Sequence, residues 1–344
     1  MRNVPHLRFP EFRGEWDIYE IGDVLCIGNG RDYKHLSKGD IPVFGTGGYM
    51  TSVNECLHEG ETTFIGRKGT INKPFYYNGK FWTVDTLFYT HSFKYVIPKF
   101  VYCLFQTINW LRYNEASGVP SLSKDTIEKI KVRIPQLDEQ KKIAKFLSLL
   151  DERIATQNKI IEKLQSLIKG IAHRVAGMGK PNVCLKECLE CTSSTLQESE
   201  VSDLGPYPVY GANGIVGFLD SYNTPDEAIY IVKDGSGVGS VVYVKGKCSA
   251  TGTLNILTAK QDYSLQFLYY MLKVFNFEPY KTGMAIPHIY FKDYSKAKIF
   301  CSSYSKQLRY AKMLEAIDAK LLIEQKVFIS LNSQKQYLLR LMFI

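Results

Sequence analysis

The sequence predicts an α+β protein in which two similar mixed α/β domains are joined by two long antiparallel α-helices that form a coiled-coil spacer. Three observations lead to this fold class. Residues from about Trp16 to Arg174 recur, at a shift of about 167 positions, from Val183 to Leu341. Each copy is rich in glycine and aromatic residues, and each ends in a segment with helical periodicity. Because the repeat is far longer than the ~20 to 50 residues of a solenoid unit, each copy should be a domain-sized object.

The first part of each copy carries glycine-rich segments at matching places. The segment 42–48 (Pro-Val-Phe-Gly-Thr-Gly-Gly) aligns with 208–214 (Pro-Val-Tyr-Gly-Ala-Asn-Gly). Further on, the Gly118 to Pro120 turn aligns with the Gly283 to Pro287 turn, just before the strand that leads to each helical segment. We interpret these turns with equal weight as structural and as loops that face a partner. The two domains are expected at residues 1–136 and 179–303.

The last part of each copy is a long amphipathic helix. From Asp138 to about Val175, apolar residues recur at steps of three and four, which keeps them on one face. Asp138 is the expected N-cap, and Gly177 ends the segment. The second copy repeats the pattern, so we expect a central helix at 137–178 and a distal helix at 304–344. At ~1.5 Å per residue, roughly 37 residues make a rod of about 55 Å.

Rods of this length are expected to pack on each other and to leave other faces free for partner helices. The alternative is that each helix only covers its own domain. Since the helices are the most similar part of the two copies, the spacer is favoured. The apolar residues expected in these helix contacts are Ile143, Leu147, Leu150, Ile154, Leu164, Leu314, Ile317, Leu321 and Leu331.

Composition places the chain among ordinary globular proteins. Of its 344 residues, 45% are apolar and 22% are charged, and no apolar run is long enough to cross a membrane. The first residues lack the apolar core of a signal peptide, so we expect a cytoplasmic location without membrane contact. Eight cysteines without even spacing are expected to stay reduced. The net charge of +9 is modest, but it suits a partner that carries phosphates.

Three short motifs resemble chemical sites, and each has a simpler explanation. Cys184, Cys188 and Cys191 have the spacing of a radical S-adenosylmethionine iron–sulfur site, but aliphatic residues occupy two of these positions in the first copy. The segment 72–75 (Asn-Lys-Pro-Phe) is close to the base-binding motif of amino-methyltransferases, but a lysine replaces its first proline. The segment 138–141 (Asp-Glu-Gln-Lys) resembles a nuclease site, but acids at a helix start act as caps. We therefore expect no catalytic residue, metal site or cofactor in this chain.

The residues best suited to bind nucleic acid lie in the glycine-rich loops and turns. Arginine and lysine suit phosphates and guanine edges, asparagine suits adenine, and glycine lets the backbone come close to a groove. Taken singly, each is more typical of a solvated loop. The expected DNA-binding residues are Gly47, Tyr49, Arg67, Lys68, Asn72, Lys73 and Ser121 in the first copy, and Asn213, Lys233, Lys245, Lys247 and His288 in the second.

Two segments in combination resemble a known family. Residues 5–12 (Pro-His-Leu-Arg-Phe-Pro-Glu-Phe) come shortly before Trp16, and residues 134–144 contain Ile-Pro, then Asp-Glu-Gln, then Ile-Ala. This combination is similar to the specificity subunit of type I restriction-modification systems, and the resemblance covers essentially the whole chain. The second copy departs from it, because only Gln307 of the helix-start motif is retained after Cys301.

The resemblance implies a non-catalytic DNA reader that binds an asymmetric, bipartite target on double-stranded DNA. One target-recognition domain would read each half, and the helix pair would set the gap. It also implies two modification subunits, which use S-adenosylmethionine to methylate adenine, and two restriction subunits, which use ATP to translocate and cut. S-adenosylmethionine, magnesium and ATP are thus expected in the partner subunits.

Two other functions stay open at the level of the sequence. A stand-alone DNA methyltransferase or nuclease with an embedded recognition domain would bind S-adenosylmethionine on the isolated chain. A purely structural coiled-coil scaffold would show no sequence preference on duplex DNA. The recognised bases and the length of the gap do not follow from the sequence, because readout depends on loop geometry and DNA shape.

Overall fold

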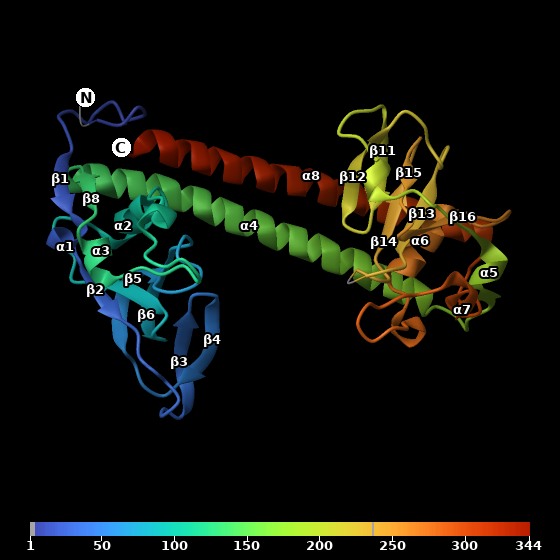
Figure 1. Cartoon of the computed structure of the whole chain (residues 1–344), viewed down its shortest axis with the longest axis horizontal. Coiled ribbons are helices and arrows are strands. Elements are labelled where there is room, and N and C mark those ends of the chain that lie inside the picture. Colours follow the sequence, from blue (N-terminus) through green and yellow to red (C-terminus); the bar gives the residue numbers. More distant parts are fainter. Residues whose placement is uncertain (1–3, 236) are drawn as a thin grey trace. The chain divides into compact units, whose positions relative to one another are not determined.

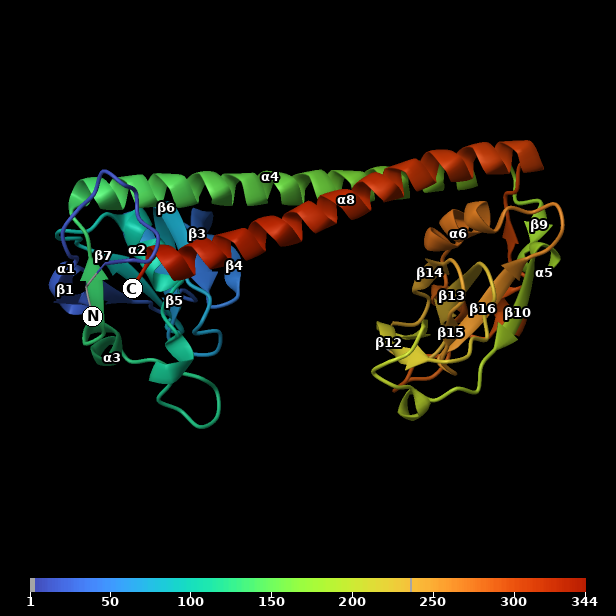
Figure 2. The same cartoon turned by 90° about the horizontal axis from the view of Figure 1, so that it is seen from above.

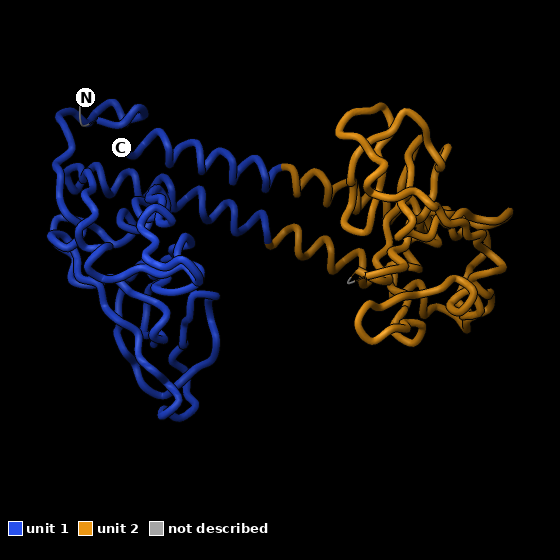
Figure 3. The backbone as a smooth tube through the Cα atoms, viewed as in Figure 1, with its two compact units in different colours: residues 1–158, 327–344 blue, residues 159–326 orange. Residues whose placement is uncertain are grey.

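The computed structural model describes residues 4–235 and 237–344, and it divides into two compact units (Figure 3). Residues 1–3, at the start of the first expected domain, and Ser236 lie outside the described residues. Unit 1 comprises residues 1–158 and 327–344, and unit 2 comprises residues 159–326. The expected boundaries treated the long helices as segments of their own. In the structure each unit includes a stretch of both helices.

Unit 1 is built on a six-stranded sheet with the order β2-β7-β5-β6-β3-β4 (Figure 1). Neighbouring strands are antiparallel, except that β3 and β6 pair in parallel. A separate antiparallel pair, β1 with β8, leads the chain into the first long helix. The strands are β1 (Asp17–Glu20), β2 (Cys26–Asn29), β3 (Lys38–Gly45), β4 (Gly48–Val53), β5 (His58–Gly66), β6 (Phe75–Thr83), β7 (Leu87–His91) and β8 (Lys131–Ile134); the short helices are α1 (Ile21–Val24), α2 (Pro98–Phe105), η1 (Trp110–Tyr113) and α3 (Lys124–Glu128).

Unit 2 repeats this plan with its sheet divided in two. Its strand orders are β10-β16-β13-β14 and β12-β11-β15, with β17 paired to β9. The central strand β13 is buried along its whole length, which suits its β-branched and aromatic residues. The strands are β9 (Val183–Cys184), β10 (Leu189–Ser193), β11 (Tyr207–Gly211), β12 (Gly214–Leu219), β13 (Ala228–Val232), β14 (Val241–Val244), β15 (Ser249–Ala250), β16 (Leu254–Ala259) and β17 (Lys298–Ile299); the short helices are α5 (Leu185–Cys188), η2 (Glu198–Glu200), α6 (Leu265–Lys273), η3 (Glu278–Tyr280) and α7 (Phe291–Tyr294).

The two long helices predicted from the repeat are present as α4 (Leu137–Ala176) and α8 (Tyr304–Met342). In unit 1 the first part of α4 lies beside the last part of α8, because Asp151 of α4 pairs with the buried ammonium of Lys335. In unit 2 the pairing is reversed, and the end of α4 shares a core with the start of α8 through Ala172 and Leu314. The helices are therefore antiparallel within each unit.

The chain ends complete the core of unit 1. Phe343, at the end of α8, packs in a triangle with Trp16 and Phe100, whose ring centroids are 6.1 and 5.4 Å from it. The backbone N–H of Leu7 donates to the carbonyl of Leu341 at 2.9 Å. In unit 2 the last turns of α4 belong to the core, and residues 177–182 connect α4 to β9.

A buried glutamine lies in the first turn of each long helix. Gln140 accepts a hydrogen bond from the N–H of Ile97 just before α2, and it donates to the carbonyls of Tyr95 and Pro135. Gln307 accepts from the N–H of Ser264 just before α6 and donates to the carbonyl of Ser302. Each glutamine thus fastens its helix start to the short helix that covers the sheet. Figure 2 shows α6 in this position between the sheet of unit 2 and α8.

One detail of the helix prediction is wrong. Helix α4 begins at Leu137, so Asp138 lies in its first turn and pairs with Lys141 instead of serving as the N-cap. Along the apolar stripe that the sequence predicts on one face of α4, Phe146 and Leu167 are exposed. No helix among the described residues has the length and apolar character needed to cross a bilayer.

Candidate nucleic-acid interface

In unit 1 a short backbone frame fixes the Gly-Pro turn against the end of β5. The N–H of Arg67 donates to the carbonyl of Thr86 at 2.8 Å, and the N–H of Leu122 donates to the carbonyl of Arg67 at 2.8 Å. Gly69 donates to the carbonyl of Pro120 at 2.8 Å from a left-handed backbone with φ of +91°, which glycine adopts without strain. Lys68 and Ser121 form an isolated β-bridge. Ser121, which lies more than fifty positions away in the sequence, is thereby brought beside Arg67 and Lys68.

These residues line a hollow of about 480 Å³ that we call hollow 1. The guanidinium of Arg67 lies over the ring of Phe88 at 5.8 Å from its centroid, and it donates to the carbonyl of Asp85. Neither Arg67 nor Lys68 forms a salt bridge within the described residues, so both cations of this lining can serve a ligand. The lining residues are Asn29, Arg67, Lys68, Asp85, Thr86, Phe88, Glu115, Ser121, Leu122, Ser123 and Lys124.

Polar contacts order the turn that forms the rim of hollow 1. Asn114 accepts hydrogen bonds from the N–H groups of Ala116 and Ser121 at 3.1 and 2.9 Å. Glu115 accepts from the hydroxyls of Thr126 and Ser123, and these bonds lower the pKa of its carboxyl group. The rim is therefore held by its own side chains, so its exposed residues present a defined surface.

Unit 2 reproduces the same frame bond by bond. Lys233 donates from its N–H to the carbonyl of Thr253 at 3.0 Å, and Ile289 donates to the carbonyl of Lys233 at 2.9 Å. Gly235, with φ of +95°, donates to the carbonyl of Pro287 at 3.0 Å. Asp234 and His288 form the β-bridge that corresponds to Lys68 and Ser121. The matching turns predicted from the repeat thus hold equivalent places.

The frame of unit 2 encloses a second hollow of about 430 Å³, which we call hollow 2. On its rim, Nδ1 of His288 lies 2.6 Å from Oδ1 of Asp234. Buried Asn255 takes the place of Phe88 in its wall and donates to the hydroxyl of Tyr294 at 3.1 Å. The lining residues are Cys191, Ser193, Lys233, Asp234, Asn255, Ile289, Tyr290, Phe291 and Lys292. The two hollows therefore share a backbone frame and differ in the side chains that it presents.

A hairpin turn lies beside each hollow. A Cβ built on Gly69 would be 3.7 Å from the hydroxyl of Thr46, in the turn between β3 and β4. In unit 2 a Cβ built on Gly237 would be 4.0 Å from the carbonyl of Ala212, in the turn between β11 and β12. These turns carry the predicted residues Gly47 and Asn213, both exposed, and Tyr49 follows in β4 with 64% of its surface exposed.

The other predicted residues lie elsewhere on their units. Asn72 and Lys73 are exposed in the turn between β5 and β6. Lys245 pairs with Glu315 of α8 at 3.3 Å, and Lys247 lies over the ring of Tyr222 at 4.9 Å. Neither lysine lines hollow 2.

The hollows also contain residues that the sequence interpretation missed. Asn29, Lys124, Asp234, Asn255 and Lys292 line them but carry no local motif. Asn29 reaches hollow 1 because it pairs with Phe88 in the register of β2 and β7. Of these residues, only Asp234 could have been predicted from the sequence, because it aligns with Lys68 when the ends of the equivalent strands are superposed.

The residues of the three motifs that resembled chemical sites have structural roles or lie in connections between strands. Cys188 is buried in the core of unit 2, where its thiol donates to the carbonyl of Leu185 at 3.4 Å, and its side chain contacts that of Cys301, which raises the pKa of the Cys188 thiol. Residues 72–74 lie in the connection between β5 and β6, as predicted. Glu139 is buried and binds the guanidinium of Arg8 through both carboxylate oxygens at 2.7 Å. This bond explains why the opening segment and the helix-start motif occur together.

The long helices carry apolar residues of two kinds. Ile143, Leu147, Leu314 and Leu331 are buried within the chain, and Leu150, Ile154, Leu164, Ile317 and Leu321 are half-buried. The chain's own units cover the buried four, and the expected contact of these nine residues with partner helices stays a prediction. The exposed large apolar and aromatic residues of these helices are Leu137, Phe146, Leu149, Ile160, Leu167, Tyr304, Leu308, Met313, Leu322, Ile323, Ile329 and Tyr337.

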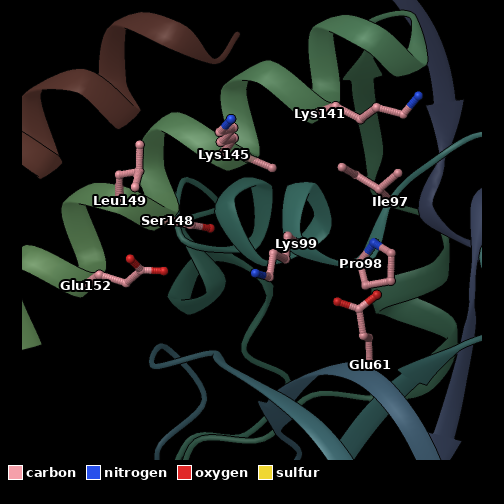
Figure 4. A pocket seen from close by; sticks show the side chains of 10 residues that line it. Glu61, Ile97, Pro98, Lys99, Lys141, Lys145, Ser148, Leu149 and Glu152 are labelled. Carbon is pink, nitrogen blue, oxygen red and sulfur yellow. The ribbon is translucent and has the colours of Figure 1, made fainter.

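One groove in unit 1 borders this exposed helix surface. It has a volume of about 580 Å³ and lies between α4 and the start of α2. Figure 4 shows Lys145, Leu149 and Glu152 along α4, with Lys99 and Glu61 on the other side of the groove. Leu149 is 55% exposed, so an apolar side chain is available beside charges of both signs.

Comparison with known proteins agrees with the repeat. The model of the type I restriction modification DNA specificity domain matches the chain twice, over residues 13–166 and 180–332. The specificity subunit of the type I restriction enzyme MjaVIII from Methanocaldococcus jannaschii is 33% identical over 201 residues, which are 50% of this chain and 44% of that protein. The specificity subunit of EcoprrI from Escherichia coli is 26% identical over 112 residues, 33% of this chain and 28% of that protein. The chain thus matches less than half the length of these relatives.

A solved structure has a similar fold. The S subunit of a type I restriction-modification system from M. genitalium aligns with a TM-score of 0.73 over 99% of both chains, at 18% sequence identity. At this identity the match speaks for the shared fold, which is the predicted arrangement of two mixed α/β units with two long helices.

Proposed function

We propose that this chain, which belongs to the type I restriction modification DNA specificity family, reads an asymmetric, bipartite target on double-stranded DNA, one half-site per unit. Hollow 1 and its hairpin turn would contact one half-site, and hollow 2 and its hairpin turn the other. Helices α4 and α8, which each contribute to both units, would set the number of base pairs between the half-sites.

The observation that carries this proposal is the pair of hollows with one frame and different side chains. Hydrogen bonds from Arg67 and Gly69 recur as those from Lys233 and Gly235, so each unit can present a surface to DNA in the same way. A duplicated reader with identical side chains would suit a symmetric target. Because Ser121 is replaced by His288 and Phe88 by Asn255, the two half-sites should differ in sequence.

The helices would supply the docking surface for modification subunits. Exposed Leu149 beside the groove of unit 1 offers an apolar anchor, and Lys99 and Glu152 offer charges at its edge. The catalytic chemistry would then belong to the partners: modification subunits would bind S-adenosylmethionine, and restriction subunits would bind ATP and magnesium. This chain would contribute sequence selection.

Mapping methylated adenines tests the proposal. The chain is expressed with its cognate modification subunit in cells without other adenine methyltransferases. We expect a motif of two short, different segments separated by a fixed number of undefined base pairs. An uninterrupted motif would contradict the bipartite reading. Methylation by the chain alone, or binding of S-adenosylmethionine to the isolated chain, would favour a stand-alone methyltransferase.

A further inference from the structure

One position in the shared frame carries opposite charges in the two units. Lys68 and Asp234 each follow the first residue after the equivalent strands β5 and β13, and each forms the β-bridge to the Gly-Pro turn of its unit. Both side chains line their hollow. The backbone thus places an ammonium in hollow 1 where it places a carboxylate in hollow 2.

We propose that this shared position determines which hydrogen-bonding class of base each unit accepts, an inference that rests on the proposed function. Lys68 selects guanine, whose N7 and O6 both accept hydrogen bonds in the major groove. Asp234 selects a base with an exocyclic amino group there, which is cytosine or adenine. Lysine has only donors and an ionised aspartate only acceptors, so the two hollows cannot read the same edge.

The neighbours of Asp234 leave it able to accept from a base. Its Oδ1 is taken by Nδ1 of His288 at 2.6 Å, while within the described residues Oδ2 accepts no hydrogen bond. The carboxylate is about one-third exposed. Its position is therefore fixed through one oxygen, and the other is free to receive an amino group.

The charges around Asp234 indicate that it is more than a solvent-exposed acid. A carboxylate near DNA repels phosphates, and hollow 2 offsets that repulsion with Lys233 and Lys292 in its lining. Asp234, placed between these two lysines, rejects bases that present only acceptors, because two acceptors cannot form a hydrogen bond. In hollow 1 the same place is filled by Lys68, beside Arg67 and Lys124.

Charge exchange at this position tests the proposal in the complete chain with its modification subunit. In Asp234→Lys, one position of the second half-site should change from an amino-bearing base to guanine, by a preference of roughly tenfold. In Lys68→Asp, one position of the first half-site should change in the opposite direction. The half-site read by the other unit should stay as in the parent in both variants.

Matched variants separate base reading from net charge. Asp220→Lys and Lys38→Asp make the same charge changes at exposed positions outside the hollows. They should change the salt dependence of DNA binding and leave the methylated motif unchanged. A motif that changes equally in these controls would overturn the proposal.

The conservative variant Asp234→Asn keeps the side-chain shape and decides the case if Asp234→Lys does not fold, as judged by its thermal unfolding midpoint. An amide can donate as well as accept, so the preference at that one position should fall by roughly five- to tenfold. If Asp234→Asn leaves every position of the motif as in the parent, the base-selection inference is wrong while the bipartite function stands. Absence of any split motif in the parent chain would instead remove the proposed function.

Discussion

At the scale of residues, Gln140 and Gln307 explain why the helix-start motif is reduced to a single glutamine in the second copy. Each side chain is almost fully buried and satisfies backbone groups that have no partner within a helix or strand. The neighbouring Glu139 binds Arg8 of the opening segment, whereas Lys306 stands at the equivalent position before Gln307. The glutamine has the same role in both units, because in each it joins the start of a long helix to the backbone just before a short helix.

Replacing either glutamine should therefore destabilise its own unit. We expect Gln140→Ala to lower the free energy of unfolding by about 1–3 kcal/mol, because the buried N–H of Ile97 loses its acceptor. Gln307→Ala should have an effect of similar size through Ser264. Denaturant unfolding followed by circular dichroism measures both. Gln136→Ala, at an exposed position just before α4, is the control and should change stability by less than about 0.5 kcal/mol; equal losses in all three variants would contradict this role.

Individual residues also show which parts of the site can be predicted from the sequence and which depend on the fold. Gly47, Arg67 and Asn213 were predicted to bind DNA because loops rich in glycine and cations are visible along the chain, and the structure places them at or beside the hollows. The convergence of Lys68 with Ser121 was not visible, because it depends on a bridge between segments more than fifty positions apart. Lys245 and Lys247 were grouped with Lys233 by composition, yet strand β14 and the turn after it place them against Glu315 and Tyr222.

At the scale of elements, the long helices were the most predictable part of the fold. Period and length alone placed α4 and α8 to within a few residues, since a helix of this length repeats its apolar pattern many times. Periodicity does not predict whether the apolar face of a helix is covered by its own unit or by a partner. Leu147 and Leu314 are covered by the cores of their own units, while Leu149 and Ile323 remain exposed on the same helices.

The exposed helix residues give a prediction for partner docking. Leu149→Glu should weaken co-purification with the modification subunit at least tenfold, because the loss of one buried leucine contact amounts to about 1.5–3 kcal/mol. Ala155→Glu introduces the same charge at another exposed position of α4 and should change binding less than about twofold. Titration of the purified chain with the modification subunit measures both dissociation constants. If the two variants bind equally well, the groove beside Leu149 is not a docking surface.

At the scale of the whole molecule, the two units are variations of one plan. Each has a sheet covered by a short helix, a stretch of both long helices, a framed hollow and a hairpin turn beside it. Nine-residue β6 of unit 1 corresponds to two separate strands, β14 and β15, in unit 2, so the plan tolerates divergence in the sheet. The hollow frame is retained because its bonds are made by the backbone, which leaves side chains free to differ.

The central claim is that each unit reads one half of a split target, and an exchange of one domain tests it most directly. Residues 1–136 are replaced by the corresponding segment of a specificity subunit with a different target, so that α4 and α8 are retained, and methylated adenines are mapped in cells that contain the modification subunit. We predict that one half of the motif changes, while the other half and the number of base pairs between them stay the same. A change in both halves, or a motif identical to that of the parent, would contradict the account.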